Sequence, residues 1–191
     1  MKDEKDWAVA VAGRIRTEGQ LEELDGISVR VDTGARLPYR YGVSILEVEE
    51  SSKSPVAEHQ TELLLYDQLD ARWWVPRVAI ECILGEVTSH DALAFSARAD
   101  RHKHVHSYLR CGVLIGGQNL FSVPAVRMFR HGDRFDFIAS WSDEKASEAE
   151  WALFVEILRE EILRSRTIQK LFSTSQDRTT YSIVHRQLSF K

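Results

Sequence analysis

The stretch from Thr61 to Gly117 most constrains what this chain can fold into, because two of its apolar runs each contain one carboxylate. Glu62 lies in the run TELLLYD, and Glu81 lies in the run VAIECIL. An acid inside a core strand is costly to bury unless a partner, commonly a cation, compensates its charge. A helical segment and a third apolar run, RCGVLIG, follow the two acidic runs. The stretch therefore predicts strand, turn, strand, helix and strand around an acidic site.

Side chains alternate between the two faces of a strand, which assigns each residue of the predicted strands 61–66 and 74–84 to a face. On the later strand one face is expected to carry Arg77, Ala79, Glu81 and Ile83, and the core face Val78, Ile80, Cys82 and Leu84. On the earlier strand Glu62 shares a face with Leu64 and Tyr66. If the strands are neighbours, the two acids converge, and close carboxylates repel unless a cation lies between them. Such oxygen ligands suit Mg²⁺ or Mn²⁺, which can activate water against a phosphodiester.

These residues resemble the core of the PD-(D/E)XK nucleases, the restriction-endonuclease-like superfamily. In that family an acid on one strand is followed, on the next strand, by an E-x-K or D-x-K tripeptide. Glu62 matches the first acid and Glu81-Cys82-Ile83 the tripeptide, and the resemblance covers residues 60–117. It implies one α/β domain over residues 1–191, with a restriction-endonuclease-like mixed central sheet flanked by helices. It also implies that Glu62 and Glu81 are catalytic and bind the metal, and that a further acid, Glu22 or Glu23, lies on the first helix.

The family lysine is replaced by Ile83, which can neither orient water nor offset charge. An alkyl group beside two carboxylates desolvates them and weakens the site as an ion binder. Three explanations remain open. A cation has migrated from another element, with Lys103 as the best catalytic candidate and Arg77 as the second. Alternatively, the domain is a catalytically dead relative kept for binding or assembly, or Ile83 is an engineered inactivating change.

The segment SARADRHKHVHSYLR is the most basic part of the predicted helix 88–108 and suggests contact with a polyanion. The candidate nucleic-acid contacts are Arg77, Arg98, Arg101 and Lys103. An ordinary solvated helix face explains the same charges equally well. His102 and His106 have the spacing of a zinc-binding pair, but no third ligand is evident nearby, so a polar helix face is favoured. Trp73-Trp74 fits a strand start in core or interface better than a base-stacking site.

Composition sets broad limits on the class of protein. The 191 residues carry a net charge of −4, split between −7 over residues 1–70 and +3 over residues 71–191. A mildly basic half beside an acidic site is compatible with a polyanionic substrate, although charge alone favours an ordinary surface. No apolar run approaches the roughly 20 residues that span a bilayer. Cys82 and Cys111 lie in apolar patterns typical of buried thiols in a reducing compartment, which predicts a cytoplasmic protein without membrane contact.

The remaining segments are assigned from periodicity and from helix and turn signals. Helices are predicted over residues 4–24 and from Ser142–Asp143 to about 171. Strands are predicted over residues 27–31, 41–48 and 134–140. A turn over 32–38, a loop over 49–59 and a β-like tail complete the prediction. The function expected is that of a Mg²⁺- or Mn²⁺-dependent DNA endonuclease of the type II restriction kind, acting as a homodimer and inactive or altered by Ile83. The alternative is a non-catalytic domain of the nuclease fold that binds nucleic acid or a protein partner.

Overall fold

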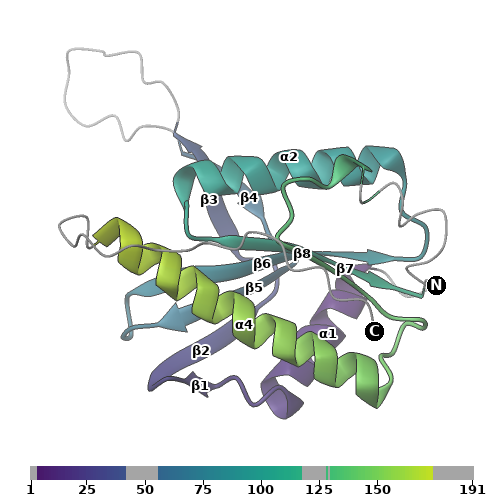
Figure 1. Ribbon diagram of the computed structural model, residues 1–191, viewed down its shortest axis with the longest axis horizontal. Helices are drawn as coiled ribbons and strands as arrows, with labels where there is room; N and C mark the ends of the chain where they lie inside the picture. Colours follow the sequence, from purple (N-terminus) through teal and green to yellow (C-terminus); the bar gives the residue numbers. More distant parts are fainter. Residues whose placement is uncertain (1–3, 42–55, 118–127, 129, 174–191) are drawn as a thin grey trace.

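The computed structural model describes residues 4–41, 56–117, 128 and 130–173. They form a mixed α/β structure with a six-stranded sheet in the order β1-β2-β5-β6-β7-β8 and a two-stranded sheet, β3-β4 (Figure 1). The strands are β1 (Glu23–Leu24), β2 (Ile27–Asp32), β3 (Arg36–Tyr41), β4 (Val56–Gln60), β5 (Leu63–Gln68), β6 (Trp74–Leu84), β7 (Arg110–Gly116) and β8 (Phe137–Ser140). The helices are α1 (Glu4–Glu18), α2 (Ser89–Val105) and α4 (Glu148–Ser173).

The six-stranded sheet is antiparallel at one side and parallel at the other. β2, β5 and β6 pair antiparallel, whereas β6, β7 and β8 pair parallel. The chain passes from β6 to β7 through α2, since parallel neighbours need such a crossover. Figure 1 shows α2 on one face of the sheet and α1 and α4 on the other. The strand side chains divide between two cores accordingly, with Ile80 and Cys82 toward α1 and α4, and Ala79 and Ile83 toward α2.

Capping residues fix where the two long helices begin. The Thr88 side chain accepts a hydrogen bond from the Asp91 N–H and the Asp91 carboxylate accepts from the Thr88 N–H, so the expected capping box is confirmed. α4 begins later than the predicted Ser142–Asp143, because Ser147 and Glu150 form the equivalent pair of side-chain to backbone hydrogen bonds. Glu150 also accepts a hydrogen bond from the Ser142 N–H, at 2.8 Å.

The N-terminal third departs most from the expected elements. The predicted turn 32–38 continues into a strand, since Gly34 at φ +73° makes the bend and β3 then starts at Arg36. The end of the predicted loop 49–59 belongs to β4, which pairs with β3. Except for Tyr41, the predicted strand 41–48 lies outside the described residues, as does the predicted β-like tail after residue 173.

A β-bulge in β6 changes the direction of one candidate site residue. Leu65 pairs with Val78 but Tyr66 pairs with Pro76, so Arg77 is an extra residue on β6. A bulge interrupts the alternation of faces. Arg77 consequently reaches Asp67, which also binds Arg166 of α4. The prediction that Arg77 shares a face with Glu81 is wrong for this reason.

Within the described ranges, no helix is both long enough and apolar enough to cross a membrane.

Candidate functional site

Glu62 immediately precedes β5, and Glu81 lies near the end of its neighbour β6. β5 and β6 are antiparallel, and their ladder ends with Leu63 paired to Ile80, one residue short of the two acids. The negative charge of Glu62 is close enough to raise the pKa of Glu81. The two acids are therefore within electrostatic range of each other.

Glu62 also has a structural task at the end of β6. β5 begins at Leu63, and the preceding Thr61 pairs with Gly34 and Ala35, so β5 gives no backbone partner to the last residues of β6 on this side. The Cys82 N–H instead donates to the Glu62 carboxylate. Two residues further on, the Leu84 N–H donates to the carboxylate of Glu4 on α1, at 3.3 Å. Side chains thus replace the carbonyls of a missing strand segment.

Of the two acids, Glu81 has the more strongly raised pKa. Its side chain is 12% exposed, and Arg98 of α2 brings its Nε to 3.5 Å from Oε1. Burial raises the pKa of Glu81 to about 7, with Arg98 opposing the rise and Glu62 adding to it. The second oxygen, Oε2, is buried without a hydrogen-bond partner among the described residues. A carboxylate in this state has unused capacity to bind a proton, a water molecule or a cation.

The pKa of Glu62 is raised for similar reasons. Burial is the main cause, the Cys82 N–H opposes it by stabilising the anion, and the charge of Glu4 adds to the rise. Arg98 and Lys5 lower the pKa of Glu62 to a smaller extent. Arg98 therefore acts on both acids, and it is the cation that the fold supplies to the pair.

Contacts on three sides fix Arg98 in this position. Its guanidinium contacts the His59 ring nitrogen, lies 4.4 Å from the centre of the Phe95 ring and faces Glu81. His59 is on β4, so the two-stranded sheet also contacts the arginine. Burial and the charge of Arg98 lower the pKa of His59, which favours the neutral ring that can accept from a guanidinium.

Ile83 occupies the lysine position as an ordinary core residue. Its side chain is 3% exposed and belongs to the apolar cluster under α2, together with Val87 and Val113. Its place on the same face as Glu81 agrees with the alternation of β6. The position next to the acids is therefore apolar, and the positive charge comes from α2 instead.

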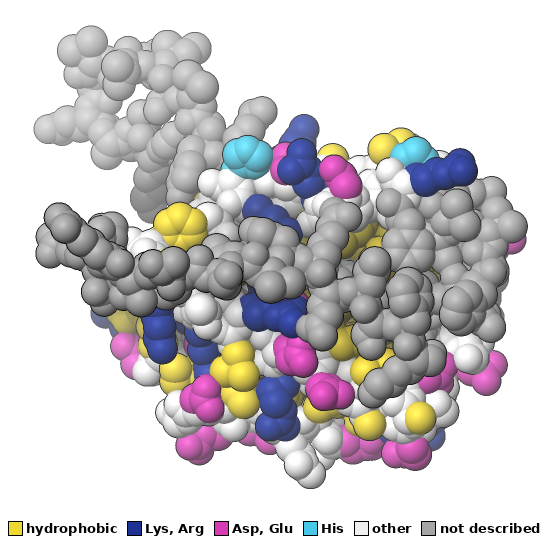
Figure 2. Space-filling view, viewed as in Figure 1, with side chains coloured by type: hydrophobic (Ala, Val, Ile, Leu, Met, Phe, Trp, Pro, Cys, Tyr) yellow, Lys and Arg dark blue, Asp and Glu magenta, His cyan; other side chains and the backbone are white. Residues whose placement is uncertain are grey.

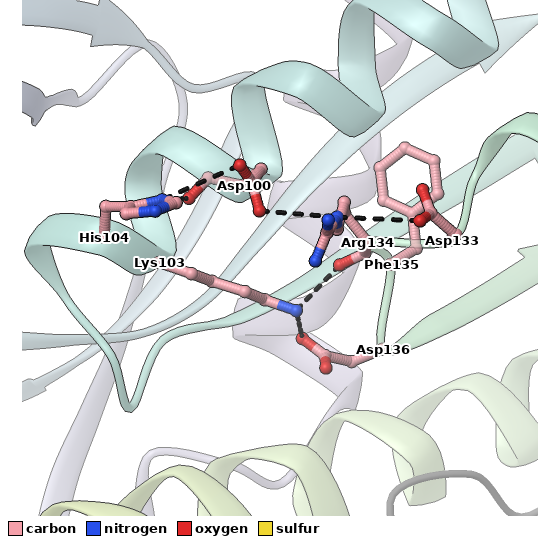
Figure 3. A pocket seen from close by; sticks show the side chains of 7 residues that line it. All are labelled: Asp100, Lys103, His104, Asp133, Arg134, Phe135 and Asp136. Carbon is pink, nitrogen blue, oxygen red and sulfur yellow. Dashed lines mark hydrogen bonds and ion pairs between the residues drawn. The ribbon is translucent and has the colours of Figure 1, made fainter.

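Lys103, the expected substitute for the missing lysine, lies in a different place. Its Nζ is 2.8 Å from the Asp136 carboxylate and donates to the Arg134 carbonyl at 2.7 Å. Figure 3 shows it in a surface pocket of about 450 Å³ between α2 and the segment before β8. The lining residues are Asp100, Lys103, His104, Asp133, Arg134, Phe135 and Asp136. The structure does not bring Lys103 to the two acids.

The other candidate nucleic-acid contacts do not lie on one surface. Arg77 is 4% exposed, and its Nε lies 2.7 Å from Asp67, so its side chain is not available at the surface. Arg101 is exposed on α2. Figure 2 shows basic, acidic and histidine side chains mixed along the edge where α2 lies, rather than one basic stripe. Arg98 and Arg101, both on α2, therefore remain as candidate nucleic-acid contacts.

The histidine pair does not form a metal site in the described residues. His102 is 3% exposed, and its Nδ1 lies 3.3 Å from the Pro38 carbonyl of β3. Burial lowers the pKa of His102 to about 4, while the Pro38 carbonyl opposes this effect. Throughout the described part of the chain, no three His, Cys, Asp or Glu side chains are grouped to hold a metal ion.

The first helix contributes Glu4 rather than the expected acids. Glu22 and Glu23 lie after the end of α1, are exposed, and Glu23 is in the edge strand β1. Glu4 lies in the first turn of α1 and reaches the end of β6. No residue pattern marks this contact, because it depends on how α1 packs across the sheet.

Comparisons with protein-family models, curated proteins and solved structures return no match to this chain.

Proposed function

We propose that this protein is a metal-dependent DNA endonuclease of the PD-(D/E)XK type, in which Arg98 substitutes for the lysine missing at position 83. The observation that carries the proposal is the proximity of Glu62 and Glu81, with the charge of Arg98 acting on both. The order of elements supports it. The first helix is α1, and the three antiparallel strands are β2, β5 and β6. The crossover helix is α2, and it leads to the parallel strand β7.

The side chains present fit Mg²⁺ or Mn²⁺. Both candidate ligands are carboxylates, and Glu81 Oε2 has no hydrogen-bond partner among the described residues. Glu62 and Glu81 would hold the ion, and since no third protein ligand is grouped with them in the described ranges, water and phosphate would complete its shell. When bound, such an ion activates water and neutralises charge on a phosphodiester.

The protein groups around the acids have separate roles in this proposal. Arg98 supplies the positive charge that the family lysine supplies, and its guanidinium can contact a phosphate oxygen. His59 and Phe95 orient that guanidinium. Ile83 and its apolar neighbours exclude water from one side of Glu81. The raised pKa of Glu81 means that ion binding must displace a proton from this carboxyl near neutral pH.

Nicking of supercoiled plasmid DNA in the presence of Mn²⁺ tests the proposal. Glu81→Ala should abolish nicking in a protein that stays folded, and Arg98→Ala should reduce it by roughly the 100-fold expected when one charge-stabilising group is lost. Arg98→Lys, which keeps the charge, should retain more activity than Arg98→Ala. Glu86→Ala, at an exposed acid just beyond β6, is the matched control and should cut normally. Equal nicking by wild type and Glu81→Ala would rule the proposal out.

One observation favours a second candidate, a non-catalytic domain of the nuclease fold. Ile83 is buried, and Arg98 already supplies part of the positive charge that a metal ion would bring to Glu81. Titration calorimetry with Mn²⁺ separates the two candidates, because a non-catalytic site should bind the ion feebly. Ile83→Lys is the complementary test. Metal-dependent nicking gained by this variant would indicate a nuclease that lacks only its lysine, and a folded, inactive variant would favour the binding role.

A further inference from the structure

The turn between β5 and β6 lies at the end of a hairpin (Figure 1). Three exposed apolar side chains belong to this turn and to the first residue of β6. Leu69 is 58% exposed, Trp73 is 65% exposed and Trp74 is 42% exposed. Folded domains rarely leave indole rings in water unless a partner covers them. The sequence pattern favours core or interface for these tryptophans, and the fold excludes the core.

Backbone hydrogen bonds hold this turn in one conformation. The Asp70 carboxylate accepts from the N–H groups of Arg72 and Trp73, at 2.6 and 2.8 Å. The Trp73 carbonyl accepts from the N–H groups of Leu69 and Asp70, at 2.9 and 3.3 Å. Trp73 thus both donates and accepts through its backbone, and its indole is presented from a fixed base. A turn whose backbone is already ordered loses less conformational entropy when it binds a partner.

The two neighbouring indoles differ in their surroundings. The Trp74 ring lies 5.3 Å from the Tyr66 ring, and the Tyr66 hydroxyl donates to Asp32 at 2.9 Å. Trp74 is therefore partly packed against the sheet, whereas Trp73 is the most exposed large apolar side chain of the described residues. Arg72, next to it in the turn, is also exposed. The tip consequently offers one open aromatic face with a cation beside it.

The size of the cluster distinguishes between classes of partner. Aromatic side chains carry roughly 150–250 Å² each, so the exposed parts of the three residues offer on the order of 400 Å². A stable protein interface takes about 800 Å² from each partner, which the tip does not supply. A single stacked base needs only one aromatic face, and a neighbouring cation suits the adjacent phosphate.

We infer that Trp73 stacks on an unpaired nucleobase and that Arg72 contacts the adjoining phosphate of the same strand. This inference rests on the proposed DNA substrate and adds a second contact point on it. Eight residues of largely extended chain separate Trp73 from Glu81, which is roughly 26 Å. That length corresponds to about eight base pairs of duplex at roughly 3.4 Å each. A duplex of about 20 base pairs that ends in a single strand is long enough to reach both places.

Tryptophan fluorescence reports on the tip selectively. The other three indoles, Trp7, Trp141 and Trp151, are at most 5% exposed, so iodide-accessible emission comes from Trp73 and Trp74. A fluorescein-labelled 20-base-pair duplex with a single-stranded end, titrated in Ca²⁺ buffer, should quench this emission, and fluorescence anisotropy should give its Kd. Trp73→Ala should raise the Kd by about 5- to 100-fold, as expected for the loss of one stacked base. Trp73→Phe, which keeps a ring, should stay within threefold of wild type, as should Leu69→Ala.

Several outcomes would overturn the inference. DNA binding by Trp73→Ala with the wild-type Kd would do so, and so would unquenched emission at saturating DNA. Loss of a dimer in Trp73→Ala, measured by light scattering with DNA affinity unchanged, would assign the tip to a second copy of the chain. Glu81→Ala separates this inference from the proposed function, since it should lose nicking but keep quenching. A wild-type protein that never nicks DNA, yet loses binding with Trp73→Ala, would support stacking and refute the nuclease.

Discussion

The Nε of Arg98 lies 3.5 Å from Oε1 of Glu81, so a cation on α2 faces an acid on β6. Ile83, two residues further along β6, provides no charge of its own. Both side chains are largely removed from water, with 27% of Arg98 and 12% of Glu81 exposed. An ion pair in such surroundings is screened less than a surface pair. Arg98 is also the group that most opposes the effect of burial on the pKa of Glu81.

Removing the Arg98 charge should raise the pKa of Glu81 above its value of about 7. Arg98→Ala eliminates the main influence that stabilises the carboxylate, while burial and the charge of Glu62 remain. The measurement is a ¹³C NMR titration of the Glu81 carboxyl carbon. Arg98→Lys is the matched control and should leave the pKa nearer that of wild type. An identical titration in Arg98→Ala would show that the pair does not form in solution.

Stability should depend on pH through Glu81. Its pKa rises from an ordinary 4.5 to about 7 on folding, so the folded state binds the proton more tightly. The resulting stabilisation is fully present below about pH 4.5 and is lost as the pH rises through about 7. The free energy of unfolding of Glu81→Gln should therefore rise relative to that of wild type by up to about 3 kcal/mol between pH 5 and pH 8. This figure follows from roughly 1.4 kcal/mol per pKa unit.

Urea denaturation of the two proteins at several pH values measures this difference. Subtracting one curve from the other isolates Glu81, because the opposite pKa shift of His102 acts in both proteins. Glu86→Gln, at an exposed position, should follow wild type. Parallel curves for Glu81→Gln and wild type would mean that Glu81 titrates as it does in the unfolded chain.

Binding of Mn²⁺, if the proposed site exists, should be stronger at pH 8 than at pH 6. Protons compete with the ion for Glu81, and a carboxyl with a pKa near 7 is mostly ionised only at the higher pH. The affinity should increase by roughly tenfold over this interval. Thermal melts with and without Mn²⁺ measure the effect, and chelation should reverse it. Glu81→Ala should show no Mn²⁺-dependent shift at either pH, and a pH-independent shift would place the ion elsewhere.

Asp67 should be among the costliest acids to neutralise. It is fully buried, and it accepts from Arg77 at 2.7 Å and from Arg166 at 2.7 and 3.0 Å. Asp67→Asn leaves two buried guanidinium groups without an anion, which should cost about 3–5 kcal/mol of unfolding free energy in chemical denaturation.

An exposed ion pair provides the control for Asp67. Arg164 and Glu160 are 40% and 51% exposed, so Glu160→Gln should cost no more than about 1 kcal/mol. Equal costs for the two substitutions would indicate that the Asp67 network contributes no more than a surface pair.

The two acids could be predicted from the sequence because strand alternation is local. Glu62 and Glu81 each stand in an apolar run, but the turn does not set the register beside them, because the bulge at Arg77 shifts the pairing by one residue. The same rule failed at Arg77, where a bulge that no residue type announces adds one residue to β6. Ile83 was assigned to the correct face, since it lies beyond the bulge on the side of Glu81.

The partners of the acids were not predictable in the same way. Arg98 and Lys103 are both basic residues of α2, and only the packing of α2 on the sheet decides which one reaches Glu81. Glu4 is a helix-start acid like many others until α1 crosses the end of β6. The Arg36–Tyr41 strand was missed because Gly34 and Pro38 are typical turn residues, whereas here the bend precedes a second sheet.

The Glu62 carboxylate has a divided role at the end of β6. One of its oxygens accepts the Cys82 N–H, and the same carboxylate is a proposed ligand, so an ion that takes this oxygen withdraws it from a backbone amide. Occupancy of the site would then loosen the last residues of the strand, and amide hydrogen exchange at Cys82 would accelerate as the ion binds. A centre built in this way would couple ligand capture to local fraying of the sheet.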